Sequence, residues 1–222
     1  MNLKEVKEEL NKAITQGIKQ YGFSFNKKAN QWEREIPGGI QIFYLLYYKH
    51  PNSILVDAMF KVKLFLIEDI YHRVTIKGED AFDATLTLGA SVVQIMQFYD
   101  EGLKIGLGKQ ASYLIETTAD LDLLKKVFPK RFEEYVLPYF NSYSSIDKVD
   151  KLLNEYPREI SIHNYLYPVR ACIAIIAAKL NRNPEYSQLI RIYDVETKNA
   201  NPHFRKEFED LVNLLESSNF KW

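Results

Sequence analysis

This chain of 222 residues has little of what marks several common classes of protein. Lys and Arg together number 29, as do Asp and Glu, so the formal net charge is zero. Proteins that bind nucleic acid need clustered excess positive charge, whereas the longest basic runs here are pairs such as Lys27-Lys28. We therefore expect no nucleic-acid partner. The single cysteine, Cys172, excludes an internal disulfide.

The sequence also lacks a long apolar run. The longest candidate, from Val169 to Leu180, is interrupted by Arg170 and is shorter than the ~18 residues that predict a membrane span. This run is typical of a buried helix. The first residues include Lys4 and Glu5 and show no apolar stretch of the kind found in secretory signals. We therefore expect a cytoplasmic protein with no membrane partner.

The strongest pattern lies between Gly22 and Ile67, where strand-forming residues follow one another in quick succession. Three strands are predicted: the first runs from residues 23–26 into 31–36, the second covers 40–48, and the third covers 54–66. In the last of these, apolar residues at even positions alternate with a mixed set that includes Asp57, Lys61 and Lys63. A period of two predicts an antiparallel strand with one face on the core and the other partly exposed.

Helical spacing precedes the sheet, and a mixed pattern follows it. Residues 3–21 carry apolar side chains three and four positions apart and end at Gly22, which predicts an N-terminal helix packed on the sheet. Further strands and helices are expected at residues 67–75 (helix), 83–88 (strand), 92–99 (strand or helix) and 110–117 (last strand).

From residue 118 onward the pattern is helical. Pro129 and Pro138 fall within the first of these helices and should bend or break it. The other helices are expected at residues 145–156, 163–181, 184–197 and 202–217. We therefore predict an α+β fold: an N-terminal helix on an antiparallel sheet of five or six strands (residues 1–117), then a helical layer (residues 118–222) packed on it.

Several short strings resemble a known family. They are Gly22-Phe23-Ser24-Phe25-Asn26-Lys27-Lys28, Trp32 in the next strand, Tyr113-Leu114-Ile115, and the helix from Asp120 through Val136-Leu137-Pro138-Tyr139-Phe140. Together they resemble the bacterial domain-of-unknown-function family 4304, over about the first two thirds of the chain. The resemblance implies an α+β fold and brings no catalytic residues.

One group of residues has the spacing of a metal site. Glu68, Asp69 and His72 would share a face of a helix, where neighbours three and four apart come together. A metal site normally needs three or four protein ligands, and the remaining histidines, His50, His163 and His203, show no companion spacing. We therefore expect a surface contact between Asp69 and His72, and neither a metal nor a cofactor.

Three other candidates fail on chemical grounds. The glycine-rich segment Gly102–Gln110 lacks the glycine spacing of a phosphate-binding loop and the hydroxyl residue after its lysine. Cys172 lies among aliphatic residues, where burial raises the pKa of a thiol and makes it a poor nucleophile. The acidic cluster of Glu79, Asp80 and Asp83 lacks the glycine and bidentate glutamate of a calcium loop. We expect no catalytic residues among these.

Fifteen tyrosines are present, and tyrosine is enriched at protein interfaces. Nine of them fall in or beside predicted elements: Tyr44, Tyr47, Tyr48, Tyr135, Tyr139, Tyr143, Tyr156, Tyr165 and Tyr167. Two functional classes follow. The favoured one is a non-enzymatic module that binds another protein through a tyrosine-rich surface, for example to neutralise a toxin. The alternative is a hydrolase or ligand-binding enzyme whose site is dispersed in the sequence.

If no metal is bound, dialysis against a chelator should leave the melting temperature unchanged, because a bound ion stabilises a folded protein by mass action. Differential scanning calorimetry before and after dialysis provides the measurement. A fall of several degrees that zinc restores, and that is absent from a His72→Ala variant, would contradict this expectation.

Overall fold

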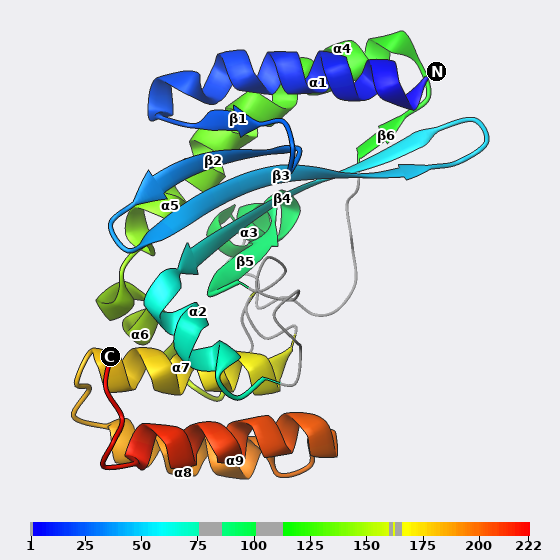
Figure 1. Ribbon diagram of the computed structural model, residues 1–222. Helices are drawn as coiled ribbons and strands as arrows, with labels where there is room; N and C mark the ends of the chain where they lie inside the picture. The colour runs from blue at the N-terminus through cyan, green and yellow to red at the C-terminus, as the bar shows by residue number, and fades with distance from the viewer. Residues whose placement is uncertain (1, 76–85, 101–112, 160–161, 163–165) are drawn as a thin grey trace. The chain divides into compact units, whose positions relative to one another are not determined.

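The computed structural model of this chain describes residues 2–75, 86–100, 113–159, 162 and 166–222. These residues form an N-terminal helix, a six-stranded antiparallel sheet, two helices between its later strands and further helices after its last strand (Figure 1). The predicted α+β fold class is therefore confirmed.

The chain divides into two compact units that interleave along the sequence. The first comprises Met1–Ile36, Ile40–Lys61 and Gly89–Ser142; the second comprises Pro37–Gly39, Val62–Leu88 and Tyr143–Trp222. The division into residues 1–117 and 118–222 expected from the sequence stays a prediction.

Helix α1 (Leu3–Ile18) starts where the Asn2 side chain accepts a hydrogen bond from the backbone N–H of Lys4. This satisfies one of the donors left open at a helix start. Its buried stripe consists of Val6, Leu10, Ile14 and Ile18. A 3-10 turn follows, and Gly22 ends it with a φ of 83°, in the left-handed region that favours glycine. The predicted helix and its glycine stop are both confirmed.

The sheet has the strand order β1-β2-β3-β4-β5, and β6 pairs with β4. The strands are β1 (Ser24–Asn26), β2 (Gln31–Ile36), β3 (Gly39–Lys49), β4 (Ile54–Leu64), β5 (Leu88–Ser91) and β6 (Tyr113–Ile115). Strand β4 was expected to reach Leu66 but ends at Leu64, because helix α2 (Phe65–His72) begins there. The ambiguous segment 92–99 lies in helix α3 (Val92–Asp100).

A short turn sets the register of β3 against β4. The backbone N–H of His50 donates to the carbonyl of Ser53 at 2.9 Å. Counting outward from this antiparallel turn places Tyr48 opposite Leu55, Leu46 opposite Asp57, and Tyr44 opposite Met59. On the other side of β4, Leu55 is paired with Leu114 of β6.

The inner face of the sheet in the first unit is closed by aromatic side chains. Phe43 contacts Trp32 and Phe132, and Phe60 contacts Tyr139 and Phe140, at centroid distances of 4.9–5.8 Å. The indole N–H of Trp32 also donates to the Thr15 hydroxyl of α1 at 2.9 Å. The stripe of α1 therefore lies on the sheet, as expected.

Helix α4 (Thr118–Arg131) begins with a capping box formed by Thr117 and Asp120. It contains Pro129, passes into a π-helical turn (Phe132–Val136), and continues as α5 (Leu137–Ser142). The irregular turn precedes Pro138, whose missing N–H removes a normal helical bond. A break in regularity near the two prolines was predicted, and it takes the form of this π-helical turn. Helices α1 and α4 approach so closely that a Cβ at Gly17 would lie 2.5 Å from the Cβ of Pro129.

Helix α7 (Tyr167–Leu180) is the centre of the second unit. It packs against α2, α6 (Ile146–Asn154), α8 (Tyr186–Thr197) and α9 (Pro202–Glu216). Because neighbours surround it, every residue from Arg170 to Ala178 is buried, as a helix that is apolar on all sides requires. The buried helix predicted around Cys172 is confirmed.

Burial in β4 follows the predicted alternation with one exception. Phe60 and Val62 are buried and Lys61 is partly exposed, but Lys63 is only 6% exposed. The expected difference in exposure between Phe60 and Val62 on one face and the two lysines on the other therefore fails at Lys63, which lies in the second unit.

Alanine substitutions at Phe60 and Lys61 should affect stability differently, because the two side chains lie on opposite faces of β4. Phe60→Ala removes a ring in contact with Tyr139 and Phe140 and should lower the free energy of unfolding by about 3–5 kcal/mol. Lys61→Ala removes a cation placed over the Tyr44 ring at 5.4 Å and should cost about 1 kcal/mol or less. Equal losses in denaturant melts would show the assignment of faces to be wrong.

Candidate functional site

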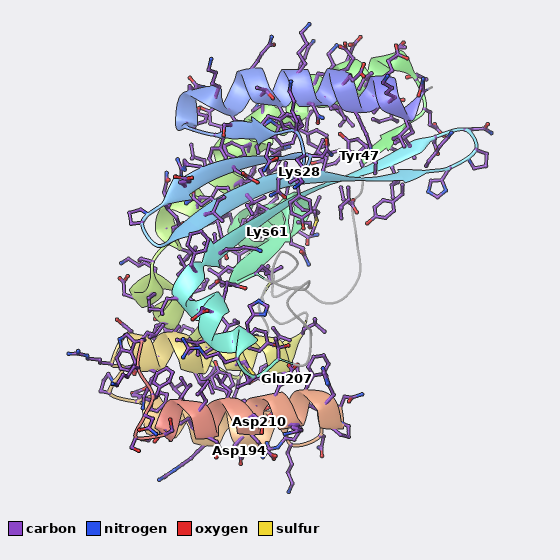
Figure 2. All side chains as sticks on the ribbon, in the orientation of Figure 1. Lys28, Tyr47, Lys61, Asp194, Glu207 and Asp210 are labelled. Atoms are coloured by element: carbon purple, nitrogen blue, oxygen red, sulfur yellow. The ribbon has the colours of Figure 1, made fainter. Side chains whose placement is uncertain are left out.

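The outer face of β3, β4 and β6, in the first unit, carries a continuous set of apolar and aromatic side chains. We call it the outer strip; it consists of Tyr44, Leu46, Tyr48, Leu55, Met59 and Leu114. The direction of these side chains follows from their neighbours, since Phe43 and Phe60 point to the aromatic core and successive strand residues alternate. Lys61 (Figure 2) lies over the Tyr44 ring and so occupies the same outer face.

Exposure is greatest at the hairpin end of the outer strip. There Tyr48, Leu55 and Leu114 form one row across three strands, and Tyr48 and Leu114 are 47% and 46% exposed. The other members are partly buried. Burial raises the pKa of the Tyr44 phenol, and the neighbouring Tyr48 raises it further. Tyr44 is therefore a neutral, partly desolvated ring at ordinary pH, as are the rings that anchor protein interfaces.

A charged side chain lies within this apolar set. Asp57 is opposite Leu46, and Leu55 and Met59 precede and follow it on the same face of β4. Its side chain is partly buried.

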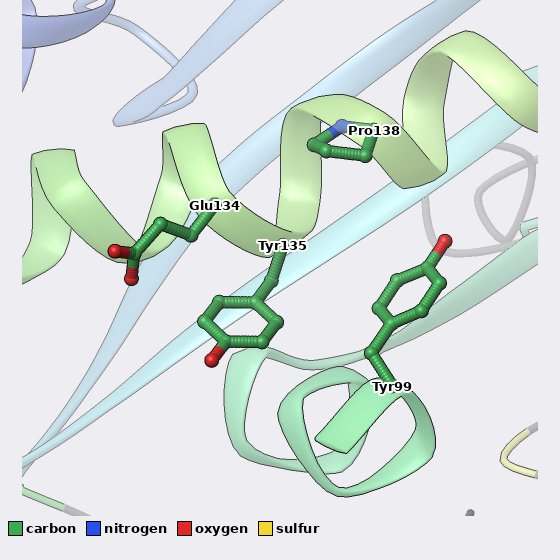
Figure 3. Close-up of a pocket in the computed structure, with 4 residues that line it drawn as sticks. All are labelled: Tyr99, Glu134, Tyr135 and Pro138. Carbon is green, nitrogen blue, oxygen red and sulfur yellow. The ribbon is translucent and has the colours of Figure 1, made fainter.

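A second candidate in the first unit is a hollow of about 450 Å³ beside the π-helical turn. Figure 3 shows the rings of Tyr99 and Tyr135 on either side of it, with Glu134 and Pro138 on the helix. The Glu134 carboxylate is ion-paired with Arg131 at 3.2 Å and with Lys130 at 3.6 Å. The acid in this hollow is thus already engaged by cations of its own helix. π-Helical turns are frequent at functional sites, which makes the hollow a secondary candidate.

The second unit contains a buried carboxylate, Glu207, on the side of α9 that faces α7 (Figure 2). It accepts hydrogen bonds from the Tyr71 hydroxyl and the Thr75 hydroxyl, both at 2.9 Å, and His203 Nε2 lies 3.3 Å away. Burial raises the pKa of the Tyr71 phenol and of the nearby Cys172 thiol, and Glu207 adds to both shifts. Neither group is therefore an activated nucleophile. The cluster joins α2 to α9.

Another buried carboxylate, Asp150, is held by asparagine amides. Asn154, Asn181 and Asn183 donate to its two oxygens at 2.6–3.0 Å. Asn154 Nδ2 also donates to the Ala174 carbonyl, and Asn154 Oδ1 accepts a hydrogen bond from the Tyr193 hydroxyl, which fixes the direction of this amide. The neighbouring Arg170 donates to the backbone carbonyl of Leu153 in α6 and to that of Pro157 beyond its end. These groups join α6, α7 and α8 and are structural.

The residues with metal-site spacing do not converge. Glu68 is fully buried and accepts a hydrogen bond from Thr87 Oγ1 at 2.7 Å, whereas Asp69 is exposed and forms an ion pair with Arg73 at 2.8 Å. His72 is partly exposed on the same helix. Within the described ranges, no group of three or more His, Cys, Asp or Glu side chains is placed to hold a metal ion.

The expectation for Cys172 is confirmed, because the thiol is buried and its pKa is raised. Three other candidates lie outside the described residues: the segment Gly102–Gln110, the cluster of Glu79, Asp80 and Asp83, and His163. His50 is exposed in the hairpin turn.

The nine tyrosines singled out in the sequence do not form one surface. Tyr44 and Tyr48 belong to the outer strip, whereas Tyr47 points to the opposite face, under Lys7 of α1. Tyr139 is buried in the aromatic core and Tyr135 lines the hollow. The remaining residues are Tyr143, Tyr156 and Tyr167 in the second unit, and Tyr165 outside the described residues.

Two members of the candidate sites were not among the tyrosines and acids singled out in the sequence. Leu114 is recognised as part of the outer strip only because it pairs with Leu55. Tyr99 is recognised as part of the hollow only because it lies across from Tyr135. Alternation in β4 did carry a signal for Asp57, since it falls among the outward residues.

Comparison of the chain with protein-family models, curated proteins and solved structures found no match. The resemblance to the domain-of-unknown-function family 4304 stays a prediction. Across the part of the chain that the structure describes, every helix is too short or too polar to cross a bilayer.

The role of Glu207 can be tested through its tyrosine donor. Tyr71→Phe leaves one oxygen of a buried carboxylate without that hydrogen bond, which should lower the free energy of unfolding by about 1–3 kcal/mol. Tyr156→Phe, at a side chain that is 60% exposed, is the matched control and should change it by less than about 0.5 kcal/mol. Denaturant melts provide the measurement, and equal effects would contradict a structural role for the Tyr71–Glu207 bond.

Proposed function

We propose that this protein is a non-enzymatic module that binds another protein through the outer strip. The observation that carries the proposal is the row of Tyr48, Leu55 and Leu114, which continues across three strands and is most exposed at Tyr48 and Leu114. Contiguous exposed apolar side chains on a soluble protein are typical of interaction sites.

The position of the strip on a sheet supports this function. Its backbone is held by strand pairing, and Tyr44 and Tyr48 have few rotatable bonds. Binding of a partner would therefore cost little conformational entropy. Burial of the exposed parts of Tyr48 and Leu114 would contribute roughly 25 cal/mol for each Å² of apolar area removed from water.

The wider proposal places this module in the bacterial cytoplasm and in the family that its sequence resembles. It rests on the balanced charge, the strings around Gly22–Lys28 and the helix from Asp120. The balanced charge also argues against a nucleic-acid partner.

A double substitution in the exposed row tests the binding function. Tyr48→Ala with Leu114→Ser should weaken binding of a captured partner by roughly tenfold or more, because interface energy is concentrated in a few anchor residues. Stability should change by about 1 kcal/mol or less, since both side chains are nearly half exposed. The measurement is affinity capture from the native host, followed by calorimetric titration of the captured protein.

Val195→Ser, at an exposed apolar residue of α8 (62%) in the second unit, is the matched control and should keep full affinity. The proposal is wrong if both variants bind alike or if no stoichiometric partner is captured. It is also wrong if the purified chain shows turnover in a broad hydrolase screen that one Asp, Glu or His substitution abolishes.

A further inference from the structure

Asp57 is an unusual residue for its position. Aspartate is depleted in strands, and β4 is an interior strand, paired with β3 on one side and with β5 and β6 on the other. The Asp57 side chain is partly buried, yet it makes no hydrogen bond or ion pair with any residue that the structure describes.

The described side chains next to Asp57 on the outer face of β3 and β4 are apolar or aromatic. Leu46 is directly opposite, Leu55 and Met59 flank it along β4, and Tyr44 and Tyr48 lie diagonally across on β3. The nearest cation along the same face is Lys61, which lies four residues away and over the Tyr44 ring. Among the described residues, the carboxylate is thus a negative charge without a partner, bordered by outer-strip side chains on β3 and along β4.

This arrangement restricts what can cover the strip. A partner with only apolar groups would desolvate Asp57 and leave it unpaired, which is strongly unfavourable. A partner that supplies a cation would form a charge-assisted hydrogen bond inside a ring of apolar contacts that exclude water. The same residue therefore favours one class of partner and rejects another.

We propose that the outer strip recognises a protein segment that presents an arginine or lysine, flanked by apolar side chains, to Asp57. This inference rests on the proposed function, and it adds the chemistry of the partner to it. Glu33, on the outer face of β2, provides a contrast, because its carboxylate already accepts hydrogen bonds from Asn26 and Gln31 within the chain.

A random heptapeptide library displayed on phage tests the inference with the full chain as the target. Parallel selections use the unmodified protein, Asp57→Asn, Glu35→Gln and Leu114→Ser. Asp57→Asn removes the charge at nearly constant shape, and Glu35→Gln is the matched control, an exposed carboxylate on β2 outside the outer strip. Melting temperatures confirm that each variant is folded before selection.

The unmodified protein and Glu35→Gln should enrich peptides in which Arg or Lys lies between apolar residues. The same peptides, made synthetically, should bind Asp57→Asn roughly tenfold more weakly or worse, lose affinity as salt rises, and shift the amide resonances of Leu46, Leu55 and Asp57.

The inference is overturned if the enriched peptides lack basic residues, if Asp57→Asn enriches the same peptides with equal affinity, or if no peptide is enriched. If the enriched peptides are neutral and only Leu114→Ser fails to bind them, the proposed binding function stands and only the requirement for a basic residue is refuted. If Asp57→Asn aggregates more but binds unchanged, the carboxylate serves solubility and the inference fails.

Discussion

The register of β3 against β4 is the constraint on which the first unit depends. Side chains alternate across a strand, so a single register decides which residues enter the core and which remain outside. The bond between His50 and Ser53 fixes this register at the turn. Phe43 and Phe60 then meet the aromatic rings of the helices, while Tyr44 remains on the outer face. A slip of one residue would exchange the two sets and destroy the core and the outer strip together.

The second unit is organised by a different principle. Its central helix, α7, is buried on all sides and carries no polar stripe to orient it. Orientation comes instead from buried polar groups: Asp150 bound by asparagine amides, Glu207 bound by Tyr71, and Arg170 bound by backbone carbonyls. Apolar burial supplies most of the driving force, and these directional bonds select one arrangement of the helices.

The sequence predicted the elements whose signals are local. The glycine stop at Gly22, the alternation in β4 and the apolar run around Cys172 all depend on near neighbours, and the structure confirms each of them. The candidate sites depend on strand pairing and helix packing between distant residues, and local patterns carry no such information. Leu114 is ordinary until β6 is paired with β4, and Glu68 looks like a surface acid until Thr87 is placed beside it.

The π-helical turn between α4 and α5 has a consequence for how the chain tolerates changes in length. A π-helical turn holds more residues than an α-helical turn, so one residue in Phe132–Val136 is surplus to the helical repeat. Its removal would restore a regular helix and keep the flanking faces in phase. One residue removed elsewhere in α4 would instead rotate everything after it by about 100°, carrying Tyr139 and Phe140 away from Phe60. The irregular turn is therefore the point in this helix where the chain can lose a residue and retain its core.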